Sequence, residues 1–481
     1  MIKSYSMKHI LPFALCLLSF ALRAQTVSQK LQTAFTIFEK DEQLKHAISS
    51  LYVIDAKTGQ VVFDKNAQIG LVPASTQKII TSVTAFELLG KEYRYKTDFG
   101  YKGNKDEHGF FKGNFYLIGH GDPTLGSPRY ERTLPNKLFE SLVAAVKKTD
   151  FKKNYKEDRR PYLTLTNGGF ENSQVNDRWI YQDIGNYYGA LHSGLNWMEN
   201  QFDIFFETGD KIGDKVEPAS FEPSYIYFDI SRNQLTTAAK GSGDNAYVYP
   251  NKLSGFITVK GTLPMAEKRF KISASHPEPE KYFADFINSK NIKAADDSIL
   301  SIFKNIQWST MPISKKDFKL LYTHYSPSLD SIIYWFNKKS INLYGEALIK
   351  TFAYEKQGFG STDSGVAIVK KFWKGKGLDV DELNIYDGSG LSPMNRVTTH
   401  AQVEILKYAK TKDWYPYFLK SLPEYNGITM KSGTIGDGKG FCGYHKAKDG
   451  REYIFSFLVN NYSGKTSGVV AKMYKVLDEL K

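Results

Sequence analysis

The alternation of apolar and polar positions predicts a chain that mixes helices and strands. Short apolar runs at residues 53–55 and 61–63 flank a glycine-containing turn, a pattern typical of a β-hairpin. Residues 76–89 then repeat apolar side chains at helical spacing, and Gly90 is placed as the C-terminal stop. These segments predict a hairpin followed by a helix, with Ser75 at the start of that helix.

The pattern changes after this helix. From residue 93 to about residue 308 it consists of short β-type runs with many aromatic residues and turns. We therefore expect a mainly-β segment inserted after the first helix. The strands expected within it are residues 114–118, 162–166, 203–206 and 256–259. The elements expected after it are helices at 329–336, 343–352, 400–408 and 469–480, and strands at 427–430 and 453–459.

The first 24 residues have the pattern of an export signal. Lys3 and Lys8 form a basic start, residues 10–21 form an apolar run too short for a comfortable membrane span, and Ala24 offers a small residue for cleavage. An uncleaved anchor is the alternative. We expect cleavage and a soluble protein in the periplasm or cell envelope.

Composition and charge narrow the class of protein. At 481 residues the chain exceeds what one hydrophobic core normally organises, so two or three domains are expected. The formal charge is +13, and part of the excess lies in a run between residues 147 and 160, which is usually a solvated face. We relate this excess to peripheral contact with a membrane or cell wall. We expect no nucleic-acid partner, because no zinc-finger, P-loop or RNA-binding signature occurs.

Once residues 1–24 are removed, Cys442 is the one cysteine left. It lies between Phe441 and Gly443, so a buried packing thiol is expected rather than a catalytic one.

Three short strings carry the candidate chemistry. They are Ser75-Thr76-Gln77-Lys78, Ser340-Ile341-Asn342 and Lys431-Ser432-Gly433-Thr434. Ordered sets of this kind are typical of β-lactamases and penicillin-binding proteins. A serine hydroxyl needs a base to take its proton, and an amine three residues along a helix lies on the same face. Lys78 is thus placed to serve Ser75, and burial together with a second cation such as Lys431 favours its neutral form.

The other strings predict supporting roles. Ser340 is placed to relay a proton to the leaving amine, and Asn342 to donate to a substrate amide while holding Lys78. Lys431 offers charge to a carboxylate, and Gly433 lets a substrate backbone approach an edge strand. Taken alone, each string has a structural explanation. That explanation is a helix N-cap for either serine, with a solvated lysine in the first string, and a turn after a strand for the third.

The chain also contains further copies of each pattern. Ser301 to Lys304 fits the first, Ser231-Arg232-Asn233 and Ser289-Lys290-Asn291 fit the second, and Lys57-Thr58-Gly59 fits the third. Ser301 lies between apolar residues, Ser231 and Ser289 begin polar stretches, and Lys57 lies at a hairpin tip. The order and setting of the trio therefore carry the prediction.

With these strings in this order, the sequence resembles the D-alanyl-D-alanine carboxypeptidase/endopeptidases, the class C low-molecular-mass penicillin-binding proteins. Ser340 follows Ser75 by 265 positions (340 − 75), whereas single-domain relatives keep the two motifs much closer. The sequence departs from the family pattern at Ser432, where threonine is commoner, and at Ile341, where Asp or Asn is usual. The further family-type strings are Gly121-Asp122-Pro123-Thr124-Leu125, Asp183-Ile184-Gly185-Asn186-Tyr187-Tyr188-Gly189-Ala190, Asp387-Gly388-Ser389-Gly390-Leu391-Ser392 and Asn395-Arg396-Val397-Thr398.

The resemblance implies an α/β (α+β) fold. It consists of a β-lactamase/transpeptidase-like domain, an antiparallel sheet with helices on both faces, that carries nested mainly-β inserted domains. The expected bounds are 1–24 for the signal peptide, 25–95 and 310–481 for the catalytic domain, 96–122 and 200–309 for inserted domain II, and 123–199 for inserted domain III.

The resemblance also implies a serine-type D-Ala-D-Ala carboxypeptidase and endopeptidase. Its substrates would be peptidoglycan stem peptides and cross-links, and β-lactam antibiotics would be covalent inhibitors. The backbone N–H groups of Ser75 and Thr434 would form the oxyanion hole, with Ser432 and Gly433 beside the substrate. We expect no cofactor and no metal, because the nine histidines are scattered and no His-Glu-x-x-His occurs.

Two alternatives remain open at this point. One is a β-lactamase or esterase on the same fold, which shares the acylation chemistry and differs in the fate of the acyl-enzyme. The other is a noncatalytic cell-wall-binding protein with a relic site. A Ser-His-Asp hydrolase is disfavoured because no Gly-x-Ser-x-Gly occurs. The balance of carboxypeptidase and endopeptidase action is left open by the sequence.

Overall fold

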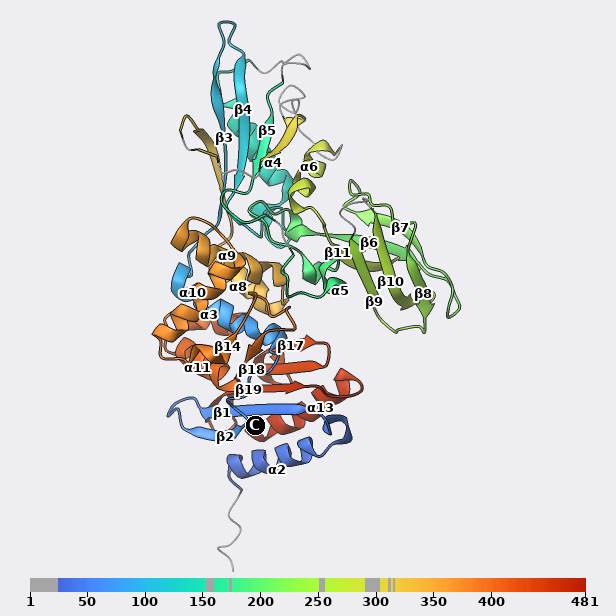
Figure 1. Cartoon of the computed structure of the whole chain (residues 1–481), viewed down its shortest axis with the longest axis vertical. Coiled ribbons are helices and arrows are strands. Elements are labelled where there is room, and N and C mark those ends of the chain that lie inside the picture. Colours follow the sequence, from blue (N-terminus) through green and yellow to red (C-terminus); the bar gives the residue numbers. More distant parts are fainter. Residues whose placement is uncertain are drawn as a thin grey trace, which may run out of the picture.

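The computed structural model describes residues 25–152, 160–172, 175–250, 256–289, 303–309, 313–314 and 316–481. The expected export signal lies outside these residues, as do much of the basic run and parts of the strings that begin at Ser289 and Ser301. Figure 1 shows an elongated molecule in which both ends of the described chain lie in the lower part and the inserted strands project above it and to one side. A search of the described residues finds no helix with the length and apolar character of a membrane span.

Six antiparallel strands form the sheet of the lower part (Figure 1). They are β1 (Ile48–Asp55), β2 (Val61–Lys65), β16 (Glu424–Tyr425), β17 (Ile428–Ile435), β18 (Gly438–Lys446) and β19 (Glu452–Asn460). The order β16-β17-β18-β19-β1-β2 places the first and last parts of the chain side by side, with Val53 opposite Phe455. Nearly every residue of β1 and β19 is buried, as expected for central strands that are covered on both faces.

Helices cover both faces of this sheet. On one face α2 (Val27–Glu39) and α13 (Thr466–Leu477) pack in a hydrophobic cluster that includes Phe35, Phe457 and Met473. On the other face α11 packs against β1 and β19. The helices on this side are α3 (Lys78–Leu89), α8 (Leu329–Lys338), α9 (Asn342–Gln357), α10 (Thr362–Gly375), α11 (Thr399–Lys410) and α12 (Tyr415–Ser421). The expected antiparallel sheet with helices on both faces is confirmed.

The predicted hairpin and first helix are also confirmed. The hairpin consists of β1 and β2, and Gly59 in its turn has a φ of 73°. The helix differs from the prediction in its first turn, because η2 (Ala74–Gln77) is a 3-10 helix and α3 begins only at Lys78. Gly90, with a φ of 80°, ends α3 as expected.

The inserted segment builds three sheets. The five-stranded sheet contains β3 (Lys96–Lys105), β4 (Phe111–Gly119), β5 (Leu163–Thr166), β12 (Ile306–Ser309) and β13 (Lys319–Tyr325). One three-stranded sheet contains β6 (Gln201–Glu207), β7 (Glu217–Glu222) and β11 (Phe270–Ser275), and the other contains β8 (Gln234–Ala238), β9 (Asn245–Pro250) and β10 (Ile257–Pro264). The helices α4 (Pro135–Lys147) and α6 (Pro279–Asn288) share one apolar cluster with all three sheets. Two short elements complete the fold: α5 (Tyr181–Ile184) and the pair β14 (Leu383–Asn384) and β15 (Arg396–Val397).

Strand pairing divides the insertion differently from the expected bounds. β5 lies within the range 123–199 but pairs with β4, with Leu163 beside Phe115. β13 still belongs to the five-stranded sheet, so the chain returns to the lower part after residue 325 rather than at residue 310. Alternation in the sequence identifies strands but does not name their partners. We propose that the five-stranded sheet forms one inserted domain and that residues 201–275 form the other.

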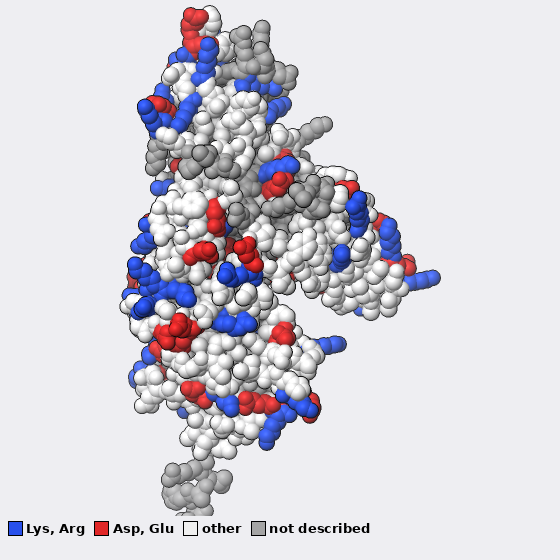
Figure 2. Space-filling model, in the orientation of Figure 1, with Lys and Arg blue, Asp and Glu red and all other residues white. Residues whose placement is uncertain are grey.

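Charged side chains are spread over the molecule. On the face shown in Figure 2, Lys and Arg lie among Asp and Glu on both the inserted part and the lower part. Of the basic run, Lys147 at the end of α4 and Lys152 are exposed, as expected for a solvated face.

Candidate active site

The three sequence strings meet where η2, α9 and β17 come together. The amine Nζ of Lys78 donates to Ser75 Oγ at 2.8 Å and to Asn342 Oδ1 at 2.7 Å. The amine of Lys431 donates to Ser340 Oγ at 3.1 Å. The structure therefore gathers the five predicted catalytic side chains in one site.

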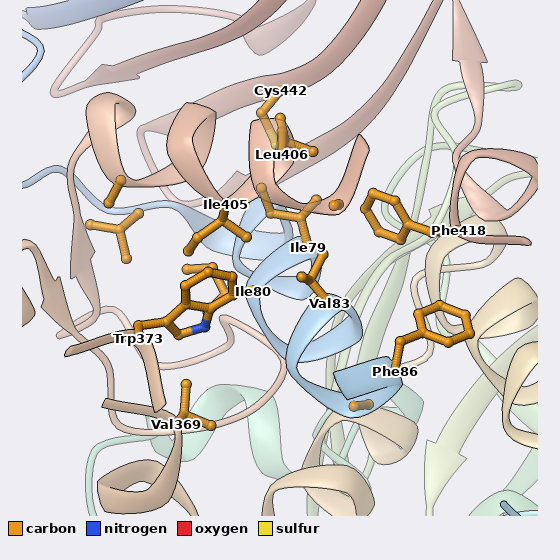
Figure 3. Close-up of a cluster of buried hydrophobic side chains, with 14 of the residues drawn as sticks. Ile79, Ile80, Val83, Phe86, Val369, Trp373, Ile405, Leu406, Phe418 and Cys442 are labelled. Atoms are coloured by element: carbon orange, nitrogen blue, oxygen red, sulfur yellow. The ribbon is translucent and has the colours of Figure 1, made fainter. Parts of the chain in front are cut away.

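A hydrophobic core fixes the helix that carries Lys78. Figure 3 shows the apolar side chains of α3 packed against residues of α10, α11, α12 and β18. Those of α3 are Ile79, Ile80, Val83 and Phe86, and the facing ones are Val369, Trp373, Ile405, Leu406, Phe418 and Cys442. Each fully buried aliphatic or aromatic side chain stabilises the fold by about 1.5–3 kcal/mol, so this packing holds the helix start in place.

Cys442 is a packing residue, as predicted. Its side chain is fully buried, and its Sγ lies 3.9 Å from the Thr76 carbonyl oxygen. Burial raises the pKa of the thiol, which keeps it protonated and unreactive.

The backbone around Ser75 is unusual. Ala74 adopts a left-handed conformation with a φ of 46°, which non-glycine residues rarely do without a surrounding structure that enforces it. A Cβ on Gly433 would lie 2.8 Å from the Ser75 backbone nitrogen, so only glycine lets β17 approach the helix start this closely. Ser75 is not the N-cap of either helix, because Pro73 precedes η2 and Gln77 precedes α3. The N-cap explanation for Ser75 is therefore wrong.

Lys78 is completely buried, so the alternative of a solvated lysine is also wrong. Its third contact is the carbonyl oxygen of Ser389, at 2.7 Å. Burial lowers the pKa of Lys78 well below its ordinary value, and the charge of Lys431 adds to the effect, while Asp387 and Glu346 oppose it. A neutral amine can donate to two of its three oxygen partners and accept the proton of Ser75.

A buried loop that begins at Asp387 surrounds this amine. One carboxylate oxygen of Asp387 accepts from the Gly390 N–H at 2.8 Å and from Gln77 Nε2 at 3.0 Å. The other accepts from the indole N–H of Trp179, a residue of the insertion, at 3.0 Å. The carboxylate thus fixes the loop that contains the Ser389 carbonyl.

Glu346 holds the same loop from α9. Its Oε1 accepts from the backbone N–H groups of Gly388 at 3.2 Å and Ser389 at 3.0 Å. Burial raises the pKa of Glu346 to about 8, and the nearby charge of Asp387 adds to the shift.

The second string lies at the start of α9. Ser340 has a left-handed φ of 56° and is not the helix cap, because Ile341 precedes the helix without a side-chain cap. The side chain of Asn342 bridges two parts of the molecule. Its oxygen accepts from Lys78, and its Nδ2 donates to the Tyr188 carbonyl oxygen of the insertion at 2.8 Å. One of its two amide N–H groups is thus already bound.

The third string lies on a strand edge. Lys431 is 1% exposed, donates to the Ser432 carbonyl oxygen at 2.9 Å, and has its pKa lowered to about 8 by burial. On the outer side, β16 pairs only with Ile428 and Thr429 of β17. Among the described strands, none pairs with residues 431–435 on that side. The open edge therefore runs directly beside Ser75.

Besides Trp179, three features of the site were not predicted from the sequence. Glu346 follows Asn342 by one helical turn, so i, i+4 spacing would have pointed to it. Lys439, whose Nζ donates to Thr434 Oγ1 at 2.9 Å, is found only from the register of β17 and β18. Tyr188 lies in one of the family-type strings, but the role of its carbonyl could not be predicted, because every residue has a carbonyl oxygen.

The look-alike strings that the structure describes in full are ordinary turns. Lys57 and Thr58 donate their N–H groups to the Asp55 carboxylate in the β1–β2 turn. Ser231 donates its N–H to the Asp229 carboxylate. No cluster of metal-ligating side chains occurs among the described residues.

Known proteins resemble this chain over most of its length. Residues 31–479 match the D-Ala-D-Ala carboxypeptidase 3 (S13) family. A D-alanyl-D-alanine carboxypeptidase of Actinomadura sp. is 25% identical over 453 residues, which cover 88% of this chain and 80% of that protein. The D-alanyl-D-alanine carboxypeptidase DacB of Haemophilus influenzae is 24% identical over 427 residues, which cover 84% of this chain and 83% of that protein.

The fold is shared with a solved structure. Penicillin-binding protein 4 (dacB) from Haemophilus influenzae matches with a TM-score of 0.75 and 20% identity, over 95% of this chain and 99% of that chain. This likeness confirms the predicted combination of a transpeptidase-like sheet with mainly-β insertions.

Proposed function

Because this chain belongs to the D-Ala-D-Ala carboxypeptidase 3 (S13) family, we propose that Ser75 is the nucleophile with which it hydrolyses D-Ala-D-Ala bonds. Family membership makes the chain a serine peptidase of the penicillin-binding type that acts on peptidoglycan peptides. The observation that carries the assignment of Ser75 is its contact with Lys78. A hydroxyl lies 2.8 Å from a fully buried amine whose pKa is lowered, which is the arrangement that activates a serine.

In this proposal acylation begins with proton transfer from Ser75 to the neutral amine of Lys78. The Ser75 oxygen attacks the carbonyl carbon of the bond to be cleaved, and negative charge develops on the carbonyl oxygen. The backbone N–H groups of Ser75 and Thr434 stabilise that charge, because the glycine between Ser432 and Thr434 brings the two strands of chain together.

The leaving amine needs a proton as the bond breaks. Ser340 is the proposed donor, and the Lys431 ammonium that donates to its Oγ favours release of the serine proton. The second amide N–H of Asn342 is the proposed donor to the substrate amide. Water then attacks the acyl-enzyme and gives its proton to the Ser340 oxygen, which restores the hydroxyl that protonated the leaving amine. The Ser75 oxygen leaves and takes back the proton held at Lys78.

Ser75→Ala tests the proposal. The purified wild-type protein is incubated with penicillin and with defined cross-linked and uncross-linked muropeptides. We expect a covalent penicillin adduct on Ser75 and release of D-alanine or of the cleaved cross-link, and neither with Ser75→Ala. A wild-type protein that does neither would sink the proposal.

The same experiment separates the alternatives. A long-lived adduct supports the peptidase, whereas rapid turnover of penicillin identifies a β-lactamase. Cell-wall binding that survives Ser75→Ala, with no wild-type hydrolysis, identifies a noncatalytic wall-binding protein.

We further propose that residues 1–24 direct export and are removed, so that the mature protein acts in the periplasm or cell envelope, in peripheral contact with wall or membrane. Mass analysis of the protein recovered from the envelope fraction is expected to give Gln25 as the first residue. A chain that keeps residues 1–24 would contradict this.

A further inference from the structure

A second lysine lies at the third string although no motif contains it. Lys439 of β18 is directly opposite Thr434 of β17. Residues that face each other in an antiparallel pair place their side chains on the same face of the sheet. The amine of Lys439 donates to Thr434 Oγ1 at 2.9 Å, and Thr434 is exposed at the open edge.

Lys439 is a buried cation without a counter-charge. Its side chain is 7% exposed, and its ammonium lies 4.5 Å from the centre of the Phe441 ring. None of the ion pairs formed by described residues includes it, and its pKa is lowered to about 8 by burial with no acid opposing the shift. An ammonium group has three N–H donors, and Thr434 accepts from one. A buried charge of this kind is costly unless something pairs with it.

Lys431 of β17 and Lys439 of β18 lie on opposite faces of the sheet. Lys431 and Gly433 point toward the nucleophile, since a Cβ on Gly433 would meet the Ser75 nitrogen and the Lys431 amine already donates to Ser340. Side chains alternate along a strand, so Thr434 lies on the other face together with Lys439. Lys431 is therefore occupied by the proton relay, and Lys439 is the lysine left to receive an anion.

The substrate brings such an anion to this place. A D-Ala-D-Ala peptide has a free carboxylate on the leaving residue, about 3.5 Å of chain beyond the carbonyl that is attacked. With that carbonyl between the N–H groups of Ser75 and Thr434, an extended peptide along the open edge carries its terminus past Thr434.

We infer that Lys439, together with the hydroxyls of Ser432 and Thr434, binds the carboxylate of the leaving D-residue and determines specificity for it. This inference rests on the proposed function. It assigns the charge that recognises the substrate terminus to Lys439 on the neighbouring strand, rather than to Lys431 of the motif.

The test compares an N-acylated peptide ending in D-Ala-D-Ala with the same peptide ending in a carboxamide. Lys439→Met keeps the aliphatic stem against Phe441 and removes the charge. We expect its kcat/KM for the carboxylate peptide to fall by about 10- to 100-fold, mainly through KM, as for loss of one charged hydrogen bond. The carboxamide peptide should lose less than about twofold, because it never had that bond. Lys439→Arg should retain most of the preference for the carboxylate.

Lys446→Met is the matched control. Lys446 is an exposed lysine of the same strand, so its loss removes an equal charge without touching the site. We expect wild-type kinetics on both peptides, and a thermal midpoint for Lys439→Met no lower than that of the wild type.

The outcomes are separable. Equal losses on both peptides, or a lowered thermal midpoint with no change in the carboxylate preference, would show that Lys439 is structural and overturn the inference. Unchanged kinetics of Lys439→Met on both peptides would overturn it as well. None of these outcomes contradicts the proposed function, since wild-type hydrolysis and the penicillin adduct on Ser75 test that function separately.

Discussion

The lower part of the molecule and the insertion contribute different kinds of atoms to the site. The lower part places side chains there: a hydroxyl, a buried amine, an amide and a second amine, each from one of the three strings. The insertion places mainly backbone, with the Tyr188 carbonyl oxygen on Asn342 and the Arg178 carbonyl oxygen on Ser392, and one indole N–H from Trp179.

This difference explains which half of the site a sequence reveals. Side-chain chemistry depends on residue type, so it leaves a motif. A carbonyl oxygen can come from any residue, so the string that contains Tyr188 does not reveal the contact that its carbonyl makes with Asn342. We expect substitutions of side chains in the lower part to slow acylation strongly and substitutions in the insertion to slow it little.

Lys78→Met tests the lower part most severely. It removes the base while keeping a side chain of similar length, so the rate of acylation by penicillin should fall about 10²- to 10⁴-fold. The measurement is the time course of adduct formation by mass spectrometry. An unchanged thermal midpoint is the control, and a rate within tenfold of wild type would contradict the role of Lys78.

The pH dependence tests the same amine without substitution. The pKa of Lys78 lies well below its ordinary value, so the neutral base persists to a lower pH than in an ordinary lysine and is lost as pH falls through the lowered pKa. The acylation rate should therefore fall about tenfold per pH unit on the acid side. A rate that stays constant or rises with falling pH, in a range where the protein remains folded, would count against a neutral lysine base.

Glu346→Ala tests how the loop around Lys78 is held. Two buried N–H groups lose their acceptor, and the Ser389 carbonyl is free to move from the amine, so acylation should slow about tenfold and the thermal midpoint should fall. Glu346→Gln keeps one acceptor oxygen and should remain near wild type. Equal behaviour of the two variants would show that the contact is unimportant.

Trp179→Phe tests the insertion and should have the smallest effect. Asp387 loses the indole donor but keeps the N–H groups of Gly390 and Ser392, so acylation should slow by no more than about threefold. Trp308→Phe, at a more exposed tryptophan of β12, is the matched control and should leave the acylation rate unchanged. A loss as large as that of Glu346→Ala would mean that the insertion acts on the chemistry as strongly as the lower part.

Prediction from sequence succeeded where local rules decide. The spacing of Ser75 and Lys78 on one helical turn, and the apolar face of α3, follow from periodicity alone. The left-handed backbone of Ala74 could not be foreseen, because it is imposed by β17 and by the loop at Gly390, both more than three hundred residues away along the chain. The strand partners within the insertion could not be foreseen for the same reason: pairing of β5 with β4 and β12 is a long-range contact.

The open edge of β17 also has a consequence for contact between copies of this protein. A strand with free N–H and C=O groups pairs with any extended chain, including the same strand of another molecule, and so joins two sheets into one. The free run from Lys431 to the turn at Gly436 is short, and two such edges brought together would place the charges of two buried lysine pairs near one another. The positive charge placed at this edge thus resists edge-to-edge association and reserves the strand for a peptide that carries a negative terminus.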